Sequence, residues 1–161
     1  RRSAARYLGR GARANVIVKD FRNSYFSYVG AEIKDFFETL KDGVDPDVVF
    51  THYREDRHQD HRVVSDLTWN TFRDHLILEY EVPKYDGDLG LPNVFVPAAP
   101  RTLMRKSRLL LSSFPSQRAK AWFTEEVFLG LARIRGIECA SPTGHAEAFY
   151  ARKAVLGLRR S

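Results

Sequence analysis

The residues best suited to chemistry in this chain are two histidines, His58 and His61, in the charged segment Thr51–Arg62. They are three positions apart, so at the start of a helix both imidazoles can face one site. A helix N-terminus disfavours a protonated imidazole, and the neutral imidazole is the form that binds a metal ion. Asp60 is a candidate to accept a ring N–H and fix the tautomer, as carboxylates do for metal-bound histidines.

The His-x-x-His spacing alone does not establish a metal site. It also fits two exposed histidines in a charged loop, and catalytic zinc usually has three protein ligands. Cys139 and His145 are six positions apart, which is no familiar zinc-finger spacing, and the chain has a single cysteine. The sequence therefore does not predict a structural zinc site built on cysteine.

Apolar spacing predicts the elements on either side of the histidines. Asp47–Thr51 is a compact β-branched run that is typical of a buried strand. A helix is predicted from about Gln59 to Asp74, with Val64, Leu67 and Phe72 on one side. Because ligands in open α/β sheets bind beyond the carboxyl ends of the strands, this arrangement favours a functional site at the histidine segment.

The other elements follow from the same patterns. Apolar runs predict strands at Asn15–Val18, Leu76–Val82 and Asn93–Val96, and a last edge strand at Glu147–Val155. Helical spacing predicts a helix end at Ser3–Leu8, a helix around Ile33, Phe36, Phe37 and Leu40 that ends at Gly43, and a helix from Pro100 to Phe114. Alternating strands and helices predict an α/β fold with a mainly parallel sheet and helices on both faces.

The helix near residue 130 has the clearest end signals. Thr124 is placed to cap it, and Phe123 and Phe128 have the spacing of a hydrophobic staple. Gly136 is predicted to close it, since glycine is the usual residue just past a helix end.

Composition limits the class of protein. The 161 residues suffice for one domain with a sizeable core. No apolar run approaches the about 20 residues that cross a bilayer, and no apolar stretch follows the N-terminal arginines as a signal peptide would require. A lone cysteine suits a reducing compartment, so we predict a cytoplasmic location.

The net charge of +6 allows two interpretations. A clustered basic face would bind nucleic acid or anionic lipid. The lysines and arginines are dispersed along the sequence instead, which favours a solvated surface, so no nucleic-acid partner is predicted.

Two segments together carry a family resemblance. Pro46–His52 followed by His58–Arg62 resembles the second signature of the PIG-L/LmbE-like zinc-dependent de-N-acetylases, in which a Pro-Asp-Val-Val strand precedes a His-Pro-Asp-His motif. Ala4–Gly9 is similar to the end of the family's first helix, and Gly144–Phe149 to its C-terminal segment. The resemblance implies a three-layer Rossmann-like fold, a Zn²⁺ cofactor, and removal of an acetyl group from an N-acetylglucosamine-type sugar or glycoconjugate.

The resemblance also implies roles for individual residues. His61 would be a zinc ligand, and His58 would lie beside the metal, polarising the amide oxygen or protonating the leaving amine. Asp60 would support His58. Gln59 replaces the usual proline of the motif and leaves both histidines in place.

The family's first signature, Ala-His-Pro-Asp-Asp, is absent from this sequence. It would supply two further zinc ligands and the general base. We therefore expect residues 1–161 to form a single LmbE-like domain without the first strand and its metal-binding loop. The chain alone is expected to bind zinc weakly and to show little or no deacetylase activity.

Substrate contacts are less specified. Arg22 follows a predicted strand and is a candidate to hold a phosphate or carboxylate, although a surface arginine fits equally well. His145 is a second candidate, beside the alternative of a charged edge strand. Lys84–Gly90 is either a lid over a sugar or a simple connection. His52 is predicted to be structural or exposed.

Two other functions stay open at this point. A domain of the same fold that lost its metal site would bind carbohydrate, or another partner, without catalysis. A nucleic-acid-binding protein is suggested by charge alone. The sequence predicts no oligomeric state.

Overall fold

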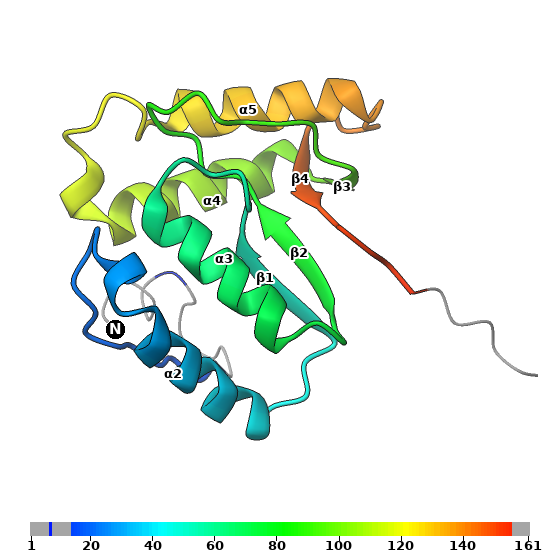
Figure 1. The fold of residues 1–161 in the computed structure, drawn as a ribbon. Helices are drawn as coiled ribbons and strands as arrows, with labels where there is room; N and C mark the ends of the chain where they lie inside the picture. The colour runs from blue at the N-terminus through cyan, green and yellow to red at the C-terminus, as the bar shows by residue number, and fades with distance from the viewer. Residues whose placement is uncertain (1–6, 8–13, 156–161) are drawn as a thin grey trace, which may run out of the picture. The chain divides into compact units, whose positions relative to one another are not determined.

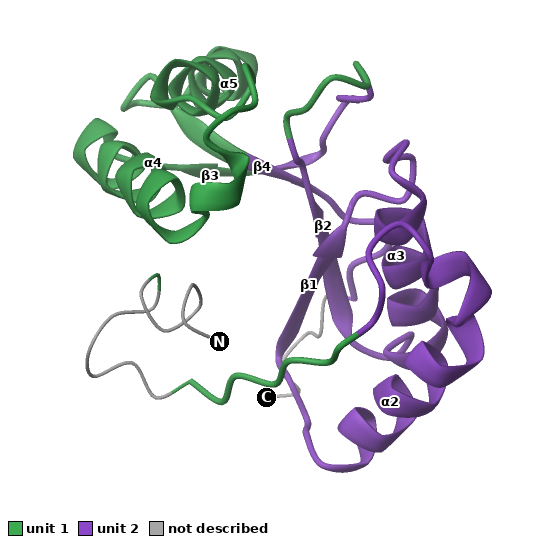
Figure 2. Cartoon of the chain, turned by 90° about the vertical axis from the view of Figure 1, so that its left-hand side faces the viewer, with its two compact units in different colours: residues 1–20, 83–87, 95–147 green, residues 21–82, 88–94, 148–161 purple. Residues whose placement is uncertain are grey.

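The computed structural model describes residues 7 and 14–155, and it divides into two compact units (Figures 1 and 2). Unit 1 contains residues 1–20, 83–87 and 95–147, and unit 2 contains residues 21–82, 88–94 and 148–161. Apart from Tyr7, the helix predicted at Ser3–Leu8 lies outside the described residues. Each unit is described by itself below.

Unit 2 contains the histidine segment. Its elements are the short helix η1 (Phe26–Tyr28), the helices α2 (Gly30–Asp42) and α3 (Gln59–Thr71), and the strands β1 (Val48–His52) and β2 (Leu76–Tyr80). β1 and β2 pair in parallel, from Val48 opposite Leu76 to His52 opposite Tyr80. Both long helices lie on the same side of these strands (Figure 2). The strands and helices predicted for this stretch are confirmed, with ends shifted by one to three residues.

The packing of α3 confirms the prediction only in part, since Phe72, just past the end of the helix, is buried. The buried positions of α3 itself include the small polar residues Ser65, Thr68 and Thr71, whereas Val64 and Leu67 are only half-buried. The hydroxyl groups of Thr68 and Thr51 lie 3.1 Å apart. Small side chains let the helix approach β1 closely, so the start of α3 is fixed relative to the end of that strand.

The described strands form one mixed sheet. The strand order is β1-β2-β4-β3, with β3 at Val94–Pro97 and β4 at Ala146–Tyr150. β4 runs antiparallel to β2, pairing Tyr150 with Glu79. The α/β class is confirmed, but the predicted mainly parallel sheet and the predicted edge position of the last strand are wrong. Apolar runs locate strands without giving their direction, and β4 has a neighbour on each side.

The strand predicted at Asn15–Val18 is also wrong. These residues have no regular structure, and about half of the Ile17 and Val18 surfaces is exposed, at 48% and 51%. A strand needs a partner for its backbone N–H and C=O groups. No partner strand for this segment lies among the residues that the structure describes.

Unit 1 contains the helices α4 (Pro100–Ser113) and α5 (Glu125–Glu138) and the short helix η2 (Pro115–Gln117). The Thr124 hydroxyl caps α5 by accepting the Val127 N–H at 3.3 Å. The rings of Phe123 and Phe128 pack edge to face at 5.3 Å, which confirms the staple. The prediction that Gly136 closes α5 is wrong, because the helix continues to Glu138.

No helix in the described part of the chain is long and apolar enough to cross a bilayer.

Candidate active site

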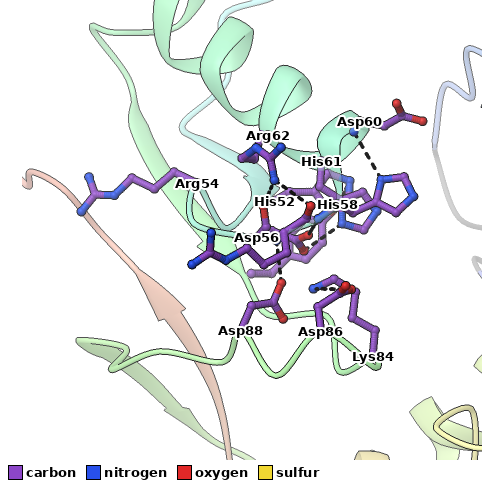
Figure 3. A network of polar contacts seen from close by, with 12 residues as sticks. His52, Arg54, Asp56, His58, Asp60, His61, Arg62, Lys84, Asp86 and Asp88 are labelled. Atoms are coloured by element: carbon purple, nitrogen blue, oxygen red, sulfur yellow. Dashed lines mark hydrogen bonds and ion pairs between the residues drawn. The ribbon is translucent and has the colours of Figure 1, made fainter. Parts of the chain in front are cut away.

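The candidate site begins where β1 ends, at His52, and continues through the loop to the first turn of α3 (Figure 3). His58 is the N-cap residue of α3, and its Nδ1 accepts the backbone N–H of Asp60 at 3.3 Å. An imidazole nitrogen that accepts a hydrogen bond carries no proton. His58 is therefore held with its proton on Nε2, where it can donate to a substrate oxygen.

His61 is held by a carboxylate that the sequence did not single out. Its Nδ1 lies 2.8 Å from Oδ2 of Asp56, whose side chain is only 3% exposed. The second oxygen of Asp56 accepts the backbone N–H of His58 at 2.8 Å. One buried carboxylate thus connects both histidines of the motif.

His52, which was predicted to be structural or exposed, adds a third imidazole to the cluster. Its ring stacks on that of His61 at 3.9 Å with an interplanar angle of 5°, and the His58 ring stacks on His61 at 4.5 Å (Figure 3). The Tyr80 hydroxyl lies 3.2 Å from Nε2 of His52. Burial raises the pKa of Tyr80 to about 12, and the charge of Asp56 adds to the shift. The hydroxyl therefore keeps its proton and can donate a hydrogen bond to Nε2 of His52.

The donor set around His61 suits zinc. Within the described residues, His52, Asp56 and His61 offer metal-ligating atoms that all lie within 4.8 Å of one another. Two imidazoles and one carboxylate are ordinary zinc ligands. In this arrangement, however, the Nδ1 of His61 is already bonded to Asp56. The nitrogen of His61 left to a metal is Nε2.

The prediction that the Asp60 carboxylate holds the His58 ring is wrong. That carboxylate accepts the backbone N–H of Ser24 at 2.6 Å and that of Phe26 at 3.1 Å, and it points away from the imidazoles (Figure 3). Ser24 has a φ of 69°, a left-handed conformation that needs such support. Asp60 therefore ties the turn before η1 to the first turn of α3.

Arg22 lies just before this tied turn. Its guanidinium stacks over the Tyr25 ring at 3.8 Å, and both side chains are exposed. Gln59 adds a further link by donating to the Ser24 carbonyl oxygen at 3.2 Å. The segment that carries Arg22 is thus anchored to the start of the histidine helix. Anion binding by Arg22 stays a prediction.

His145 belongs to unit 1. Its Nδ1 lies 3.2 Å from the carbonyl oxygen of Thr143, in the turn before β4. Nearby in sequence, Glu147 forms an ion pair with Lys106 at 2.5 Å. A substrate-binding role for His145 stays a prediction.

Glu79 is a second carboxylate that sequence reasoning missed. It is fully buried in β2 and accepts the Arg54 backbone N–H at 3.0 Å and the Trp69 indole N–H at 2.6 Å. Arg152 pairs with it at 3.2 Å and stacks over Trp69 at 4.3 Å. The signal was a glutamate placed among the apolar residues of a predicted strand, since such a residue is buried only when it is paired. Glu79 fixes the loop that leads to Asp56.

Comparisons with known proteins match the part of the chain that contains the histidine segment to one family. The PIG-L family model, described as GlcNAc-PI de-N-acetylase, matches residues 1–72, which include His58 and His61. This match confirms the family resemblance predicted from the sequence. No curated protein matches the chain.

Several solved structures share the fold. The zinc-inhibited form of teicoplanin deacetylase Orf2 is 18% identical and has a TM-score of 0.59; the alignment covers 88% of this chain and 57% of that one. The conserved protein TT1542 from Thermus thermophilus is 20% identical (TM-score 0.57, 81% and 62% covered). N,N'-diacetylchitobiose deacetylase from Pyrococcus horikoshii is 18% identical (TM-score 0.50, 81% and 54% covered). This chain therefore spans less than two thirds of the length of these structures.

Proposed function

We propose that the natural protein containing this chain is a zinc-dependent N-deacetylase, because residues 1–72 match the PIG-L family model. Its substrate would be an N-acetylated sugar or glycoconjugate of the N-acetylglucosamine type. The observation that carries the proposal is the paired arrangement of His58 and His61 at the start of α3, both bonded to Asp56.

The two histidines divide the work. His61 would hold the metal, and bound zinc supplies Lewis acidity and lowers the pKa of a water ligand to about 7. His58, with its proton on Nε2, is suited to polarise the amide oxygen or to protonate the leaving amine. The products would be acetate and an amino sugar. The general base and the other ligands would come from the family's first signature, which this sequence does not contain.

The remaining residues would orient the substrate. Asp60 keeps the turn that follows Arg22 against α3, so a guanidinium anchored there would bind a phosphate or carboxylate of the glycoconjugate. His145 would be a further substrate contact. The lone cysteine suits a cytoplasmic location.

Acetate release tests the proposal. The natural protein, loaded with zinc, should release acetate from an N-acetylglucosamine conjugate, and a chelator should abolish the release until zinc is restored. Glucosamine conjugates without the acetyl group serve as the product control. Binding of the conjugate without any acetate release by the zinc-loaded protein would favour a carbohydrate-binding domain of the same fold instead.

A further inference from the structure

We propose that Asp56 is the residue that sets the tautomer of His61 and thereby directs its Nε2 toward the metal. This positioning role rests on the proposed zinc chemistry of the site. It belongs to a residue that precedes the histidine motif and has no counterpart in the pattern His-x-Asp-His.

The bonding of Asp56 leaves one tautomer of neutral His61. Carboxylate oxygens only accept hydrogen bonds, so the short contact of 2.8 Å between Oδ2 and the His61 Nδ1 places the imidazole proton on Nδ1. The Nε2 lone pair then remains for a metal. A carboxylate partner of this kind also raises the basicity of a metal-bound imidazole.

Asp56 is held firmly enough to perform this role. Asp56 is buried, with 2% of its surface exposed. Its backbone N–H donates to the Tyr53 carbonyl oxygen at 3.1 Å. The Arg62 guanidinium donates to the Asp56 carbonyl oxygen, also at 3.1 Å. The loop is also held on both sides of Asp56. The Arg54 backbone N–H donates to Glu79, and the Arg57 backbone N–H donates to Asp88. A carboxylate in so constrained a loop is preorganised.

Replacement of Asp56 by asparagine separates this role from a general structural one. The His58 backbone N–H can only donate, so the oxygen of the new side-chain amide must face it. The amide NH₂ then faces His61, whose Nδ1 has to accept. Asp56→Asn therefore moves the imidazole proton of His61 to Nε2, the nitrogen that a metal would need.

Asp60→Asn is the matched control. This carboxylate accepts from the backbone of Ser24 and Phe26 and makes no contact with the His61 ring. The change has the same chemistry, in the first turn of the same helix. It should leave the tautomer of His61 as it is.

The experiment is ¹⁵N NMR of the imidazoles in this chain, without metal, at about pH 8.5, well above the ordinary histidine pKa of about 6.5. We expect His61 to be protonated on Nδ1 in the unchanged chain and in Asp60→Asn, and on Nε2 in Asp56→Asn. The unchanged chain tests the proposal even if Asp56→Asn fails to fold. His61 protonated on Nε2 in the unchanged chain would overturn it, as would an unaltered tautomer in folded Asp56→Asn.

Zinc titration of the same samples distinguishes this inference from the proposed function. Zinc should shift the Nε2 resonance of His61 while the Nδ1 proton stays, and Asp56→Asn should weaken zinc binding about 10- to 100-fold. Zinc on Nδ1 would instead replace the bond to Asp56 and would refute the positioning role. The metal-free tautomers test Asp56 even where acetate release, and with it the proposed function, fails.

Discussion

Two regions of the molecule contain sequence that resembles the same family: the histidine segment of unit 2, and the contact between Gly136 and Gly144 in unit 1, called the glycine contact below. Different physical interactions hold the two regions together. In the first, Asp56 bonds the His61 imidazole with one carboxylate oxygen and accepts the His58 backbone N–H with the other. In the second, α5 touches the backbone of the turn before β4: a Cβ at Gly136 would lie 2.3 Å from the Gly144 carbonyl oxygen. Family-like sequence therefore coincides with a hydrogen-bonded histidine cluster in one region and with close backbone packing in the other.

The largest effect is expected from a change in the histidine segment. His61→Ala removes the proposed metal ligand, so acetate release by the natural protein should fall more than about a hundredfold. Steady-state kinetics on an N-acetylglucosamine conjugate measure it. Full activity in this variant would mean that the histidine segment does not carry the chemistry.

Among the kinetic parameters, His58→Ala should act mainly on turnover. The change leaves the proposed ligand in place, so kcat should fall about a hundredfold, the range for a positioned acid or an oxyanion donor, while KM changes less. Kinetic measurement of the two parameters separately checks this. A rise in KM with kcat unchanged would assign His58 to substrate binding instead.

A change at the glycine contact should lower the free energy of unfolding. Gly136→Ala forces a methyl group against the Gly144 backbone, which should cost about 1–3 kcal/mol in the free energy of unfolding. Gly130→Ala is the matched control in the same helix, since its added Cβ would meet nothing within 4 Å. That control should be neutral or stabilise the helix by up to about 1 kcal/mol. Urea denaturation of both variants measures the difference, and equal midpoints would contradict the close-packing account.

The smallest effect is expected at Tyr80, whose hydroxyl contacts His52 of the histidine segment. Its pKa is raised by burial to about 12, against about 10 in an unfolded chain. The folded state therefore keeps the proton more tightly, and its contribution to stability should be complete below pH 10 and fall by about 2 kcal/mol between pH 10 and 12. Tyr80→Phe should lose this alkaline dependence. Identical slopes of unfolding free energy against pH in both proteins would contradict it.

The sequence predicted local features well where one residue type has one physical use. The Thr124 cap and the Phe123–Phe128 staple follow from spacing alone, and both are present. Gly136 was misassigned because glycine serves both helix ends and close contacts, and only the three-dimensional neighbour distinguishes them. The direction of β4 was missed for a related reason, since a strand's apolar pattern is the same in either direction.

For the site, the sequence located the segment but not its bonding. His58 and His61 were predicted from their spacing, and the structure places them in one stack. Asp60, which lies between them in sequence, was the carboxylate singled out, and Asp56 was not. Its carboxylate is used to fix the turn at Ser24, a contact across 36 positions that no local pattern reveals.

Zinc content per folded molecule tests the central claim most directly. Metal analysis would compare His61→Ala with Gly136→Ala in the natural protein, after the folded fraction of each has been measured. We predict that folded His61→Ala retains little zinc, whereas folded Gly136→Ala retains as much as the unchanged protein. Full zinc in His61→Ala would contradict the assignment of the metal site to the histidine segment.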